Sequence, residues 1–361
     1  MSRVDLIIIG GFLGAGKTTS IVRIARHLLE MEKKIGIITN DQGSNLVDTN
    51  FLTSAGLSVL EVKEGCFCCN FDQFLMRIQD FTERDKPDII LAEPVGSCTD
   101  LVATIFRPLD RGLTGALNLR PLSIVVDPRR LRKLMMEESS EFHSEINYLF
   151  RKQLEEADII VLNKVDTLKE EEIDEMNLFI KETFKWSELI NVSAKEDKNI
   201  DKWIEKLFIG SPSERVLDID YTLYGDAEAR LGWLNLTCQL EKDEEIDMNS
   251  IASTILDMVK DIFFKERYEI AHIKLYGTSE KDWLKASITS IYEDVNFDKT
   301  ALIPDKRWNL IINARVDVEP EKLESKMQEV LDLIKKKYKV NINEVNIQCF
   351  SPRFPVPRYR L

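Results

Sequence analysis

The chain has 361 residues, too many for one ordinary hydrophobic core, so we expect two domains. Hydrophobic residues make up 44% and charged residues 31% of the sequence, as in a soluble globular protein. The 62 acidic residues outnumber the 49 basic ones, and the net charge of −13 argues against broad nucleic-acid binding because such a surface repels phosphate backbones. One local basic pocket for a small anion remains compatible with this charge.

The apolar stretches are short throughout. The run that precedes the first glycines is too short for a secretory signal or a membrane span, and no other stretch approaches eighteen apolar residues. We therefore expect a cytoplasmic protein without a membrane partner, in which thiols stay reduced. Disulfide bonds are then a poor explanation for the three cysteines at positions 66, 68 and 69.

The first two hundred residues alternate between short apolar runs and helical stretches. The runs are rich in β-branched residues and lack polar alternation, which is typical of strands buried on both faces. Strands that alternate with helices predict a mostly parallel sheet with right-handed crossovers, so residues 1–210 are expected to form an α/β domain. The expected strands are 4–10, 34–40, 57–63, 88–94, 122–127, 157–166 and 188–195, and the clearest helices are 17–32, 71–84 and 199–208.

The second part of the chain has a different pattern. Residues 211–228 mix Pro, Ser, Gly and both charges, which predicts a linker. Beyond it, apolar and polar residues alternate, so residues 229–361 are expected to form a smaller α+β domain with an antiparallel sheet and helices on one face. The expected strands include 231–240, 269–277, 283–292 and 308–317, and the helices are 247–266 and 320–338.

The sequence GFLGAGKT at residues 11–18 fits G-x-x-x-x-G-K-[ST] and stands between an expected strand and an expected helix. Glycines let such a loop curl so that backbone N–H groups point at phosphate oxygens, and the helix N-terminus adds positive charge. The strand–loop–helix context disfavours a glycine-rich turn without a ligand, and so predicts a P-loop NTPase domain. The expected contacts are Gly11, Gly14, Ala15 and Gly16 with phosphates, Lys17 with the β- and γ-phosphates, Thr18 with Mg²⁺ and Thr19 with the α-phosphate.

The sequence NKVD at residues 163–166 indicates which base is bound. The Asp166 carboxylate can accept hydrogen bonds from guanine N1–H and the exocyclic amine, whereas adenine has no matching donors there. Asn163 is expected to brace the loop and the Lys164 stem to cover one face of the base. About thirty residues later the run Ser193, Ala194 and Lys195 can offer a backbone N–H to guanine O6. Together these features favour GTP over ATP.

The γ-phosphate and Mg²⁺ need further contacts, and two strand ends are candidates. Glu93 and Gly96 lie in LAEPVG at the carboxyl end of an expected strand, where open α/β sheets bind ligands. Glu93 can hold Mg²⁺ or a water, and the Gly96 N–H can meet the γ-phosphate. Asp41 ends the preceding strand and is a candidate for Mg²⁺ or for the attacking water, although an ordinary turn former is an equally good interpretation.

The set GFLGAGKT, GCFCC, EPVG, NKVD and SAK, in this order, resembles the CobW/HypB/UreG family of P-loop GTPases. The Cys-x-Cys-Cys element is similar to that of the CobW-like branch, which includes proteins regarded as zinc and cobalt chaperones. The resemblance covers about residues 1–210, and the later half is similar in layout to the CobW C-terminal domain. It departs from the family at NDQGS (40–44), where relatives often carry acidic residues, and in having only three scattered histidines.

The resemblance implies GTP-dependent delivery or insertion of a transition metal, often with dimerisation, and it carries Cys66, Cys68 and Cys69 over as candidate metal ligands. Thiolates suit Zn²⁺, Co²⁺ or Cu⁺, and three sulfurs plus a fourth donor satisfy a tetrahedral ion. Buried structural cysteines and a redox pair are the alternatives. Cys98 follows EPVG closely and is either the fourth ligand, if its loop folds towards the cluster, or a buried small residue at a helix start.

Two functions are therefore open. The first is a metal-binding GTPase that couples its nucleotide state to delivery of a metal, with Zn²⁺ or Co²⁺ as the expected ion and a client metalloprotein as partner. The alternative is a GTPase switch that assembles or reactivates a metal- or corrinoid-containing enzyme, in which the cysteines are structural. In both cases a homodimer is possible, and intrinsic GTP hydrolysis is expected to be slow because no arginine finger stands out in the sequence.

Overall fold

The computed structural model describes residues 3–40, 47–54, 56–62, 65–112, 117–136, 144–292 and 294–361. The chain divides into two compact units, each described here by itself. The first comprises Met1–Gln42, Leu52–Gly225 and Pro355–Leu361, and the second comprises Gly43–Phe51 and Asp226–Phe354. Both ends of the chain therefore contribute to the first unit.

The first unit contains an eight-stranded sheet in which all described pairings are parallel. The order is β3-β2-β4-β1-β6-β7-β8, with β5 paired to β1. Apart from Val4 and Asp5 at the start of β1, the residues of the central strands are buried because helices cover both faces of the sheet, as their unbroken apolar runs require. The strands are β1 (Val4–Gly10), β2 (Ile35–Asn40), β3 (Val59–Val62), β4 (Ile89–Glu93), β5 (Leu117–Leu119), β6 (Ser123–Val126), β7 (Ile159–Leu162) and β8 (Glu188–Asn191).

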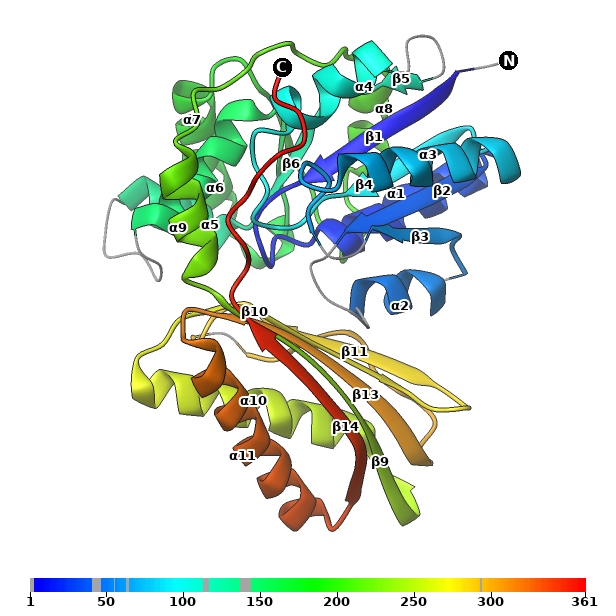
Figure 1. The fold of residues 1–361 in the computed structure, drawn as a ribbon, viewed down its shortest axis with the longest axis vertical. Coiled ribbons are helices and arrows are strands. Elements are labelled where there is room, and N and C mark those ends of the chain that lie inside the picture. The colour runs from blue at the N-terminus through cyan, green and yellow to red at the C-terminus, as the bar shows by residue number, and fades with distance from the viewer. Residues whose placement is uncertain are drawn as a thin grey trace. The chain divides into compact units, whose positions relative to one another are not determined.

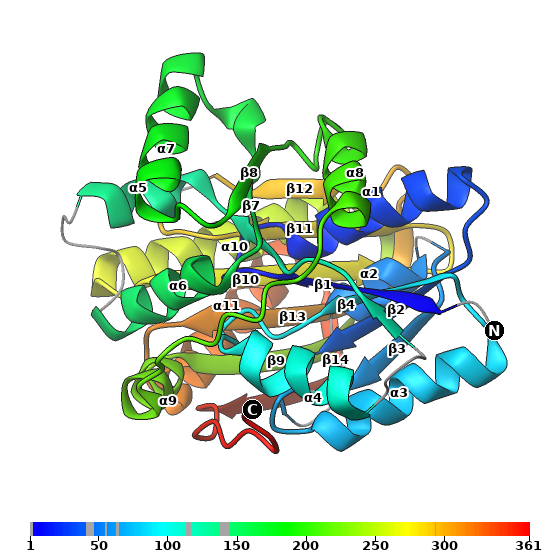
Figure 2. The same ribbon diagram turned by 90° about the horizontal axis from the view of Figure 1, so that it is seen from above.

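Figure 2 shows the helices of this unit on both sides of the sheet, with α1 and α8 together on one face and α3 on the other. The sequence of α1 explains why this helix packs on the sheet. Its apolar residues 21, 24, 25 and 28 recur at helical spacing and are buried against the strands. The helices are α1 (Lys17–Glu30), α3 (Phe71–Arg84), α4 (Arg107–Gly112), α5 (Pro128–Met136), α6 (Ser144–Glu156), α7 (Glu170–Thr183) and α8 (Ile200–Ile209). A π-helical turn, Val102–Phe106, precedes α4, and a 3-10 turn, Val165–Thr167, follows β7.

The second unit is a six-stranded antiparallel sheet with α10 (Met248–Glu266) and α11 (Pro320–Tyr338) on one face (Figure 1). The order is β12-β11-β10-β13-β9-β14. Alternate residues of β9 and β13 enter the core with the two helices, which explains the alternating pattern of the sequence. The strands are β9 (Gly232–Ile246), β10 (Ile270–Thr278), β11 (Trp283–Ile288), β12 (Asn296–Lys299), β13 (Asp305–Val316) and β14 (Asn341–Phe350).

The prediction of a parallel P-loop NTPase sheet followed by an antiparallel α+β sheet is confirmed. Helix α9 (Tyr221–Ala229) occupies the end of the expected linker. Among the helices that the structure describes, none is long and apolar enough to cross a bilayer.

Helix α2 (Val47–Ser54) follows β2, yet its first turn belongs to the second unit. The Val47 N–H donates to Asn313 Oδ1 at 2.9 Å. Asp48 forms an ion pair with Lys274 and has Lys285 Nζ 3.9 Å from its Oδ1. Burial opposes the ionisation of Asp48, but the two lysines hold the pKa of its carboxyl far below the usual range.

Candidate functional site

The phosphate loop connects the end of β1 at Gly10 to the start of α1 at Lys17. Gly11 has φ +130°, and a Cβ there would lie 2.2 Å from the carbonyl oxygen of Val125 in β6. Gly16 has φ +94°, and a Cβ there would lie 2.5 Å from Asn163 Nδ2. Since both the backbone angle and the neighbours exclude a side chain, these two positions require glycine. Gly14 also has a positive φ, and Ala15 is buried in the same loop.

Lys17 and Thr18 are almost completely buried at the start of α1. Lys17 Nζ donates to the carbonyls of Gly11 at 2.9 Å and Phe12 at 3.3 Å, so its ammonium lies over the loop in which phosphates are expected. Thr18 Oγ1 donates to Glu93 Oε1 at 3.1 Å. This hydroxyl–carboxylate pair supplies the hard oxygen ligands that Mg²⁺ prefers. Thr19 is partly exposed in the same turn.

The loop after β4 packs directly against the phosphate loop. A Cβ at Gly96 would lie 2.7 Å from the Leu13 side chain, and the Gly96 carbonyl accepts a hydrogen bond from Gln153 Nε2 at 3.0 Å. The structure therefore brings Glu93 and Gly96 to the phosphate loop, at the carboxyl edge of the sheet. Asp41, the other expected residue for Mg²⁺ or water, lies outside the residues that the structure describes.

Asn163 joins the phosphate loop to the loop after β8. Its Nδ2 donates to the carbonyl of Ala15 at 2.9 Å, and its Oδ1 accepts the N–H of Ala194 at 3.0 Å. Nearby, Ser193 Oγ donates to Asp166 Oδ1 at 2.6 Å. The motifs NKVD and SAK are thus assembled beside the phosphate loop as one hydrogen-bonded group, in which Lys195 is the exposed member.

Two charged residues that the sequence did not single out, Asp127 and Arg23, support this group. Lys164, which has a left-handed backbone with φ +59°, pairs through Nζ with Asp127 Oδ2 at 2.6 Å. Burial opposes the ionisation of Asp127, but Lys164 lowers the pKa of that carboxyl below its usual range. Arg23 in α1 donates to the carbonyls of Ala194 and Lys195, both at 2.9 Å. Asp127 and Arg23 stand outside any recognised motif, so only the fold reveals them.

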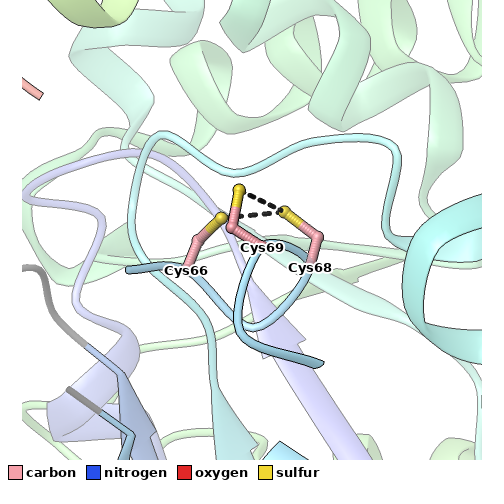
Figure 3. A group of neighbouring side chains, drawn as sticks. All are labelled: Cys66, Cys68 and Cys69. Carbon is pink, nitrogen blue, oxygen red and sulfur yellow. Dashed lines mark hydrogen bonds between the residues drawn. The ribbon is translucent and has the colours of Figure 1, made fainter. Parts of the chain in front are cut away.

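The three clustered cysteines lie on the turn that leads into α3, and their sulfurs converge (Figure 3). The three Sγ atoms all lie within 4.8 Å of one another. The Cys66 and Cys68 sulfurs are 2.8 Å apart, and those of Cys68 and Cys69 are 3.9 Å apart. Cys66 and Cys68 are buried, whereas Cys69 is partly exposed. This arrangement presents three sulfur donors to a single point.

Asn40, the last residue of β2, fixes the shape of the cysteine turn. Its Nδ2 donates to the carbonyls of Val62 at 3.1 Å and Gly65 at 2.7 Å, and its Oδ1 accepts the N–H of Phe67 at 2.8 Å. The Phe67 ring stacks on Phe74 of α3 at a centroid distance of 4.1 Å. The turn is therefore anchored to the carboxyl end of β2, the strand that leads to Asp41. No sequence pattern signals this role of Asn40, because the contacts join residues far apart in the chain.

The pKa values of the three thiols are shifted in different directions. Hydrogen bonds from Cys68, Cys69 and Cys98 lower the pKa of the Cys66 thiol well below its usual range. The hydrogen bond between Cys68 and Cys66 raises the pKa of the Cys68 thiol. The hydrogen bond between Cys69 and Cys66 raises the pKa of the Cys69 thiol to about 12. Cys66 is thus the sulfur on which a thiolate is best stabilised, and a thiolate is the form that binds metal.

The loop that carries Cys98 folds towards the cluster. The Cys98 side chain is buried, and it interacts with the thiols of Cys66 and Cys68. Its carbonyl accepts a hydrogen bond from Gln153 Nε2 at 2.8 Å. The remaining two cysteines are in the second unit, where Cys238 is buried in the core and Cys349 donates to the carbonyl of Pro320.

A parallel sheet with a glycine loop between its first strand and first helix, and a buried lysine and threonine at that helix start, defines a P-loop nucleotide-binding protein. A sequence model described as "CobW/HypB/UreG, nucleotide-binding domain" matches residues 5–189, half of the chain. The chain belongs to this family, and the resemblance carried by its motifs is confirmed.

Among characterised relatives, the chain is 34% identical over 173 residues to the zinc chaperone YeiR of Escherichia coli K12, which covers 46% of this chain and 47% of that protein. It is 33% identical over 188 residues to the zinc chaperone CobW of Sinorhizobium sp, covering 46% and 52%. It is 31% identical over 184 residues to the zinc-regulated GTPase metalloprotein activator 1 of Saccharomyces cerevisiae, covering 46% and 42%. The match spans about half the length of these relatives.

Solved structures of the same kind are more distant. The Zn(II)-bound YjiA GTPase from E. coli is 14% identical with a TM-score of 0.38, over 91% of this chain and 99% of that one. HypB from Helicobacter pylori in complex with nickel is 16% identical with a TM-score of 0.42, over 60% and 92%. Similarity at this level carries no argument about function.

Proposed function

We propose that this protein binds and hydrolyses GTP and couples its nucleotide state to the delivery or insertion of a transition metal. The observation that carries the proposal is the convergence of three cysteine sulfurs within 4.8 Å, on a turn that Asn40 anchors to a strand of the nucleotide-binding sheet. Metal ligands and phosphate contacts are then built on the same strand ends. The names of the relatives, two zinc chaperones and a GTPase metalloprotein activator, support this function.

The nucleotide site supports GTP with Mg²⁺. Gly11, Gly14, Ala15 and Gly16 would surround the phosphates, Lys17 would move from its own loop carbonyls to the β- and γ-phosphates, and Thr19 would contact the α-phosphate. Thr18 and Glu93 would hold Mg²⁺, with Asp41 as a further ligand or the group that orients water. Gly96 would contact the γ-phosphate, and the base would lie among Asn163, Lys164, Asp166 and residues 193–195.

The thiol geometry fits a tetrahedral ion. With Zn–S bonds of about 2.3 Å, sulfurs at the corners of a tetrahedron lie about 3.8 Å apart. The Cys68–Cys69 distance of 3.9 Å matches this edge, and the Cys66–Cys68 distance of 2.8 Å would widen by about 1 Å. An all-sulfur donor set suits Zn²⁺ and Co²⁺, and the names of the relatives favour zinc.

Coupling between the two sites rests on two short connections. Asn40 ends β2 immediately before Asp41 and hydrogen-bonds the backbone of the cysteine turn. Gly96 contacts Leu13 of the phosphate loop and leads within two residues to Cys98. A γ-phosphate that shifts either strand end would therefore change the positions of the sulfurs, which is the two-state element that a switch needs. We expect slow intrinsic hydrolysis, stimulated by a client metalloprotein or by a second copy of the chain.

Metal binding is tested by equilibrium dialysis of Zn²⁺ with the wild type and with the triple variant Cys66→Ser/Cys68→Ser/Cys69→Ser, each with GDP and with a non-hydrolysable GTP analogue. We expect about one ion per wild-type chain, a nucleotide-dependent affinity, and loss of binding in the variant. Cys349→Ser, which changes a partly exposed cysteine of the second unit, is the matched control. Unchanged Zn²⁺ affinity in the triple variant would contradict the proposed metal-binding role of these cysteines.

The base preference is tested with Asp166→Asn. The amide keeps one acceptor but also presents a donor to the guanine donors, so GTP affinity should fall by about 100-fold. Xanthosine triphosphate, whose O2 accepts that donor, should gain affinity. Competition of ATP and GTP for the wild-type site provides the second measurement, and equal competition would overturn the choice of GTP.

The burial of Cys66 and Cys68 favours one second candidate. In it the cysteines pack the turn, and the GTPase assembles or reactivates a metal- or corrinoid-containing enzyme. Capture of such an enzyme by the GTP-bound protein, at equal yield with and without metal chelator and with the triple serine variant, would support this candidate over metal delivery.

A further inference from the structure

We propose that Cys98 is the fourth sulfur of the metal site, so that the cluster is a four-thiolate cage assembled from two different loops. This inference rests on the proposed metal-binding function and adds a ligand to it. Cys98 comes from the loop after β4, whereas the other three cysteines share the turn before α3.

Hydrogen bonds of one short segment join the Cys98 loop to the cysteine turn. The Arg358 N–H donates to the Cys68 carbonyl at 2.8 Å, and the Leu361 N–H donates to the Ala103 carbonyl, five residues beyond Cys98, at 2.9 Å. The sulfurs of Cys66, Cys68 and Cys69 lie within 4.8 Å of one another, and the buried Cys98 side chain interacts with the thiols of Cys66 and Cys68. A tetrahedral ion bound by the three sulfurs has one position left for a fourth donor, which Cys98 would supply.

The loop of Cys98 is held in one position by buried polar contacts. Gln153 binds the Cys98 carbonyl, and Glu156 accepts hydrogen bonds from Thr99 Oγ1 at 3.0 Å and from the Leu101 N–H at 2.7 Å. Cys98 is itself 2% exposed. A ligand fixed in this way loses little conformational entropy when it binds, and it would link metal coordination to the loop that contacts the phosphate loop.

The test is Co²⁺ binding followed by its visible and near-ultraviolet spectrum in the wild type and in Cys98→Ser. The thiolate-to-cobalt charge-transfer intensity scales with the number of sulfurs, so it should fall by about a quarter in the variant. Cys238→Ala, a buried cysteine of the second unit, is the control and should keep the wild-type spectrum. A Cys98→Ser spectrum identical to that of the wild type would overturn the fourth ligand while leaving the metal function intact.

The number of sulfurs around bound Zn²⁺ in the wild type, from X-ray absorption, tests the same point without a variant. Four sulfurs would support the cage, and three would exclude it. A wild type that binds neither ion would instead overturn the proposed function itself.

A different observation carries a second proposal, which concerns residues 355–361. This segment lies within the first unit and crosses the two loops that carry the four cysteines. The Arg358 N–H donates to the Cys68 carbonyl at 2.8 Å. The Leu361 N–H donates to the carbonyl of Ala103, beyond Cys98, at 2.9 Å.

An ion pair with a buried carboxylate anchors the segment, in addition to an exposed pair between Arg358 and Asp72. Arg360 Nε donates to Asp100 Oδ2 at 2.7 Å, and Tyr221 donates to the same oxygen at 2.8 Å. The Asp100 side chain is 1% exposed, whereas that of Arg360 is 40% exposed, so the anchor is buried on one side only. We infer that residues 355–361 form a strap over the thiol site and that the strap must lift before metal can leave.

The strap is tested by mixing Zn²⁺-loaded protein with a colorimetric chelator and measuring the rate of metal transfer. In Arg360→Ala the rate should rise about 10-fold, because a charge-assisted hydrogen bond worth about 1.4 kcal/mol is lost. Arg360→Lys should restore part of the slow rate. Arg353→Ala, an exposed arginine outside the strap, should behave as the wild type.

The Co²⁺ spectrum should be the same in Arg360→Ala and in the wild type, since the strap supplies no ligand. An unchanged transfer rate in Arg360→Ala would overturn the strap. Failure of all these proteins to bind metal would instead count against the proposed function.

Discussion

The side chain of Asn163 donates to the carbonyl oxygen of Ala15 at 2.9 Å, and this bond ties the loop after β7 to the phosphate loop. The same side chain accepts the N–H of Ala194 at 3.0 Å, so one residue aligns three segments. We predict that Asn163→Ala lowers GTP affinity at least 10-fold and the free energy of unfolding by about 2 kcal/mol, because two buried hydrogen bonds are lost. Titration with a fluorescent GTP analogue and chemical denaturation measure the two effects.

Asn249 offers a matched control for this prediction. It makes a corresponding, partly buried pair of bonds in the second unit, donating to the Ala301 carbonyl and accepting the Ala301 N–H, both at 2.8 Å. Asn249→Ala should therefore also destabilise the protein, by about 1 kcal/mol, while GTP affinity is unchanged. A loss of GTP affinity in both variants would show that general instability, not the alignment of loops, explains the effect of Asn163.

Gly11→Ala should destabilise the nucleotide-free protein by several kcal/mol, since the new Cβ would lie 2.2 Å from a β6 carbonyl oxygen and the backbone would have to shift. Gly56→Ala is the control, because it imposes the cost of a positive φ on alanine without the steric clash. Gly56 has φ +80°, but no atom of the described residues lies within 4 Å of the position that its Cβ would take, so the loss should be only about 1 kcal/mol. Equal losses in the two variants, measured by chemical denaturation, would contradict the steric explanation.

Glu156 should make stability depend on pH. Burial, together with the nearby charge of Asp100, raises the pKa of this carboxyl from 4.5 to about 8. Between these two values the folded protein keeps a proton that the unfolded chain has lost, so stability falls as the pH rises and levels off above about pH 8. The slope from this group is about 1.4 kcal/mol per pH unit. Glu156→Gln should remove it, and parallel curves for the two proteins would exclude Glu156 as the source.

Asp48→Asn should lower the free energy of unfolding by about 3 kcal/mol, chiefly because it puts a neutral side chain beside Lys274, whereas Lys285, which is 3% exposed, keeps its ion pair with Asp298. Asp257→Asn is the control. Asp257 pairs with Lys260 on α10 with half its side chain exposed, and loss of that pair should change stability by less than about 1 kcal/mol. Similar denaturation midpoints for the two variants would show that the Asp48 ion pair contributes little.

The sequence was sufficient to predict those elements whose structure depends mainly on neighbouring residues in the chain. The apolar runs of β1, β4 and β7 and the glycine pattern before α1 define strands and a phosphate loop without reference to the rest of the chain. The alternation in β9 and β13 likewise indicates an antiparallel sheet. In contrast, β5 has three residues and β12 is the polar sequence NFDK, so neither produces a pattern that a sequence can reveal.

The parts that could not be predicted are contacts between distant segments. Nothing in the sequence NDQGS indicates that Asn40 shapes the cysteine turn, or that Asp127 meets Lys164. Residues 355–361 follow the last strand of the second unit, so sequence order groups them with the second domain, whereas their hydrogen bonds are with the first unit. Cys98 is buried, which fits both alternatives that the sequence left open for it, so its role as a fourth ligand stays a prediction.

The route of the chain has a consequence for the protein during its synthesis. Residues 355–361 complete the first unit, yet the ribosome makes them only after the whole of Asp226–Phe354. Because domains generally fold as they emerge, the cysteine turn and the Cys98 loop are in place while the segment that crosses them does not yet exist. A nascent chain would therefore lack the strap that we infer over these thiols until the second unit has been translated.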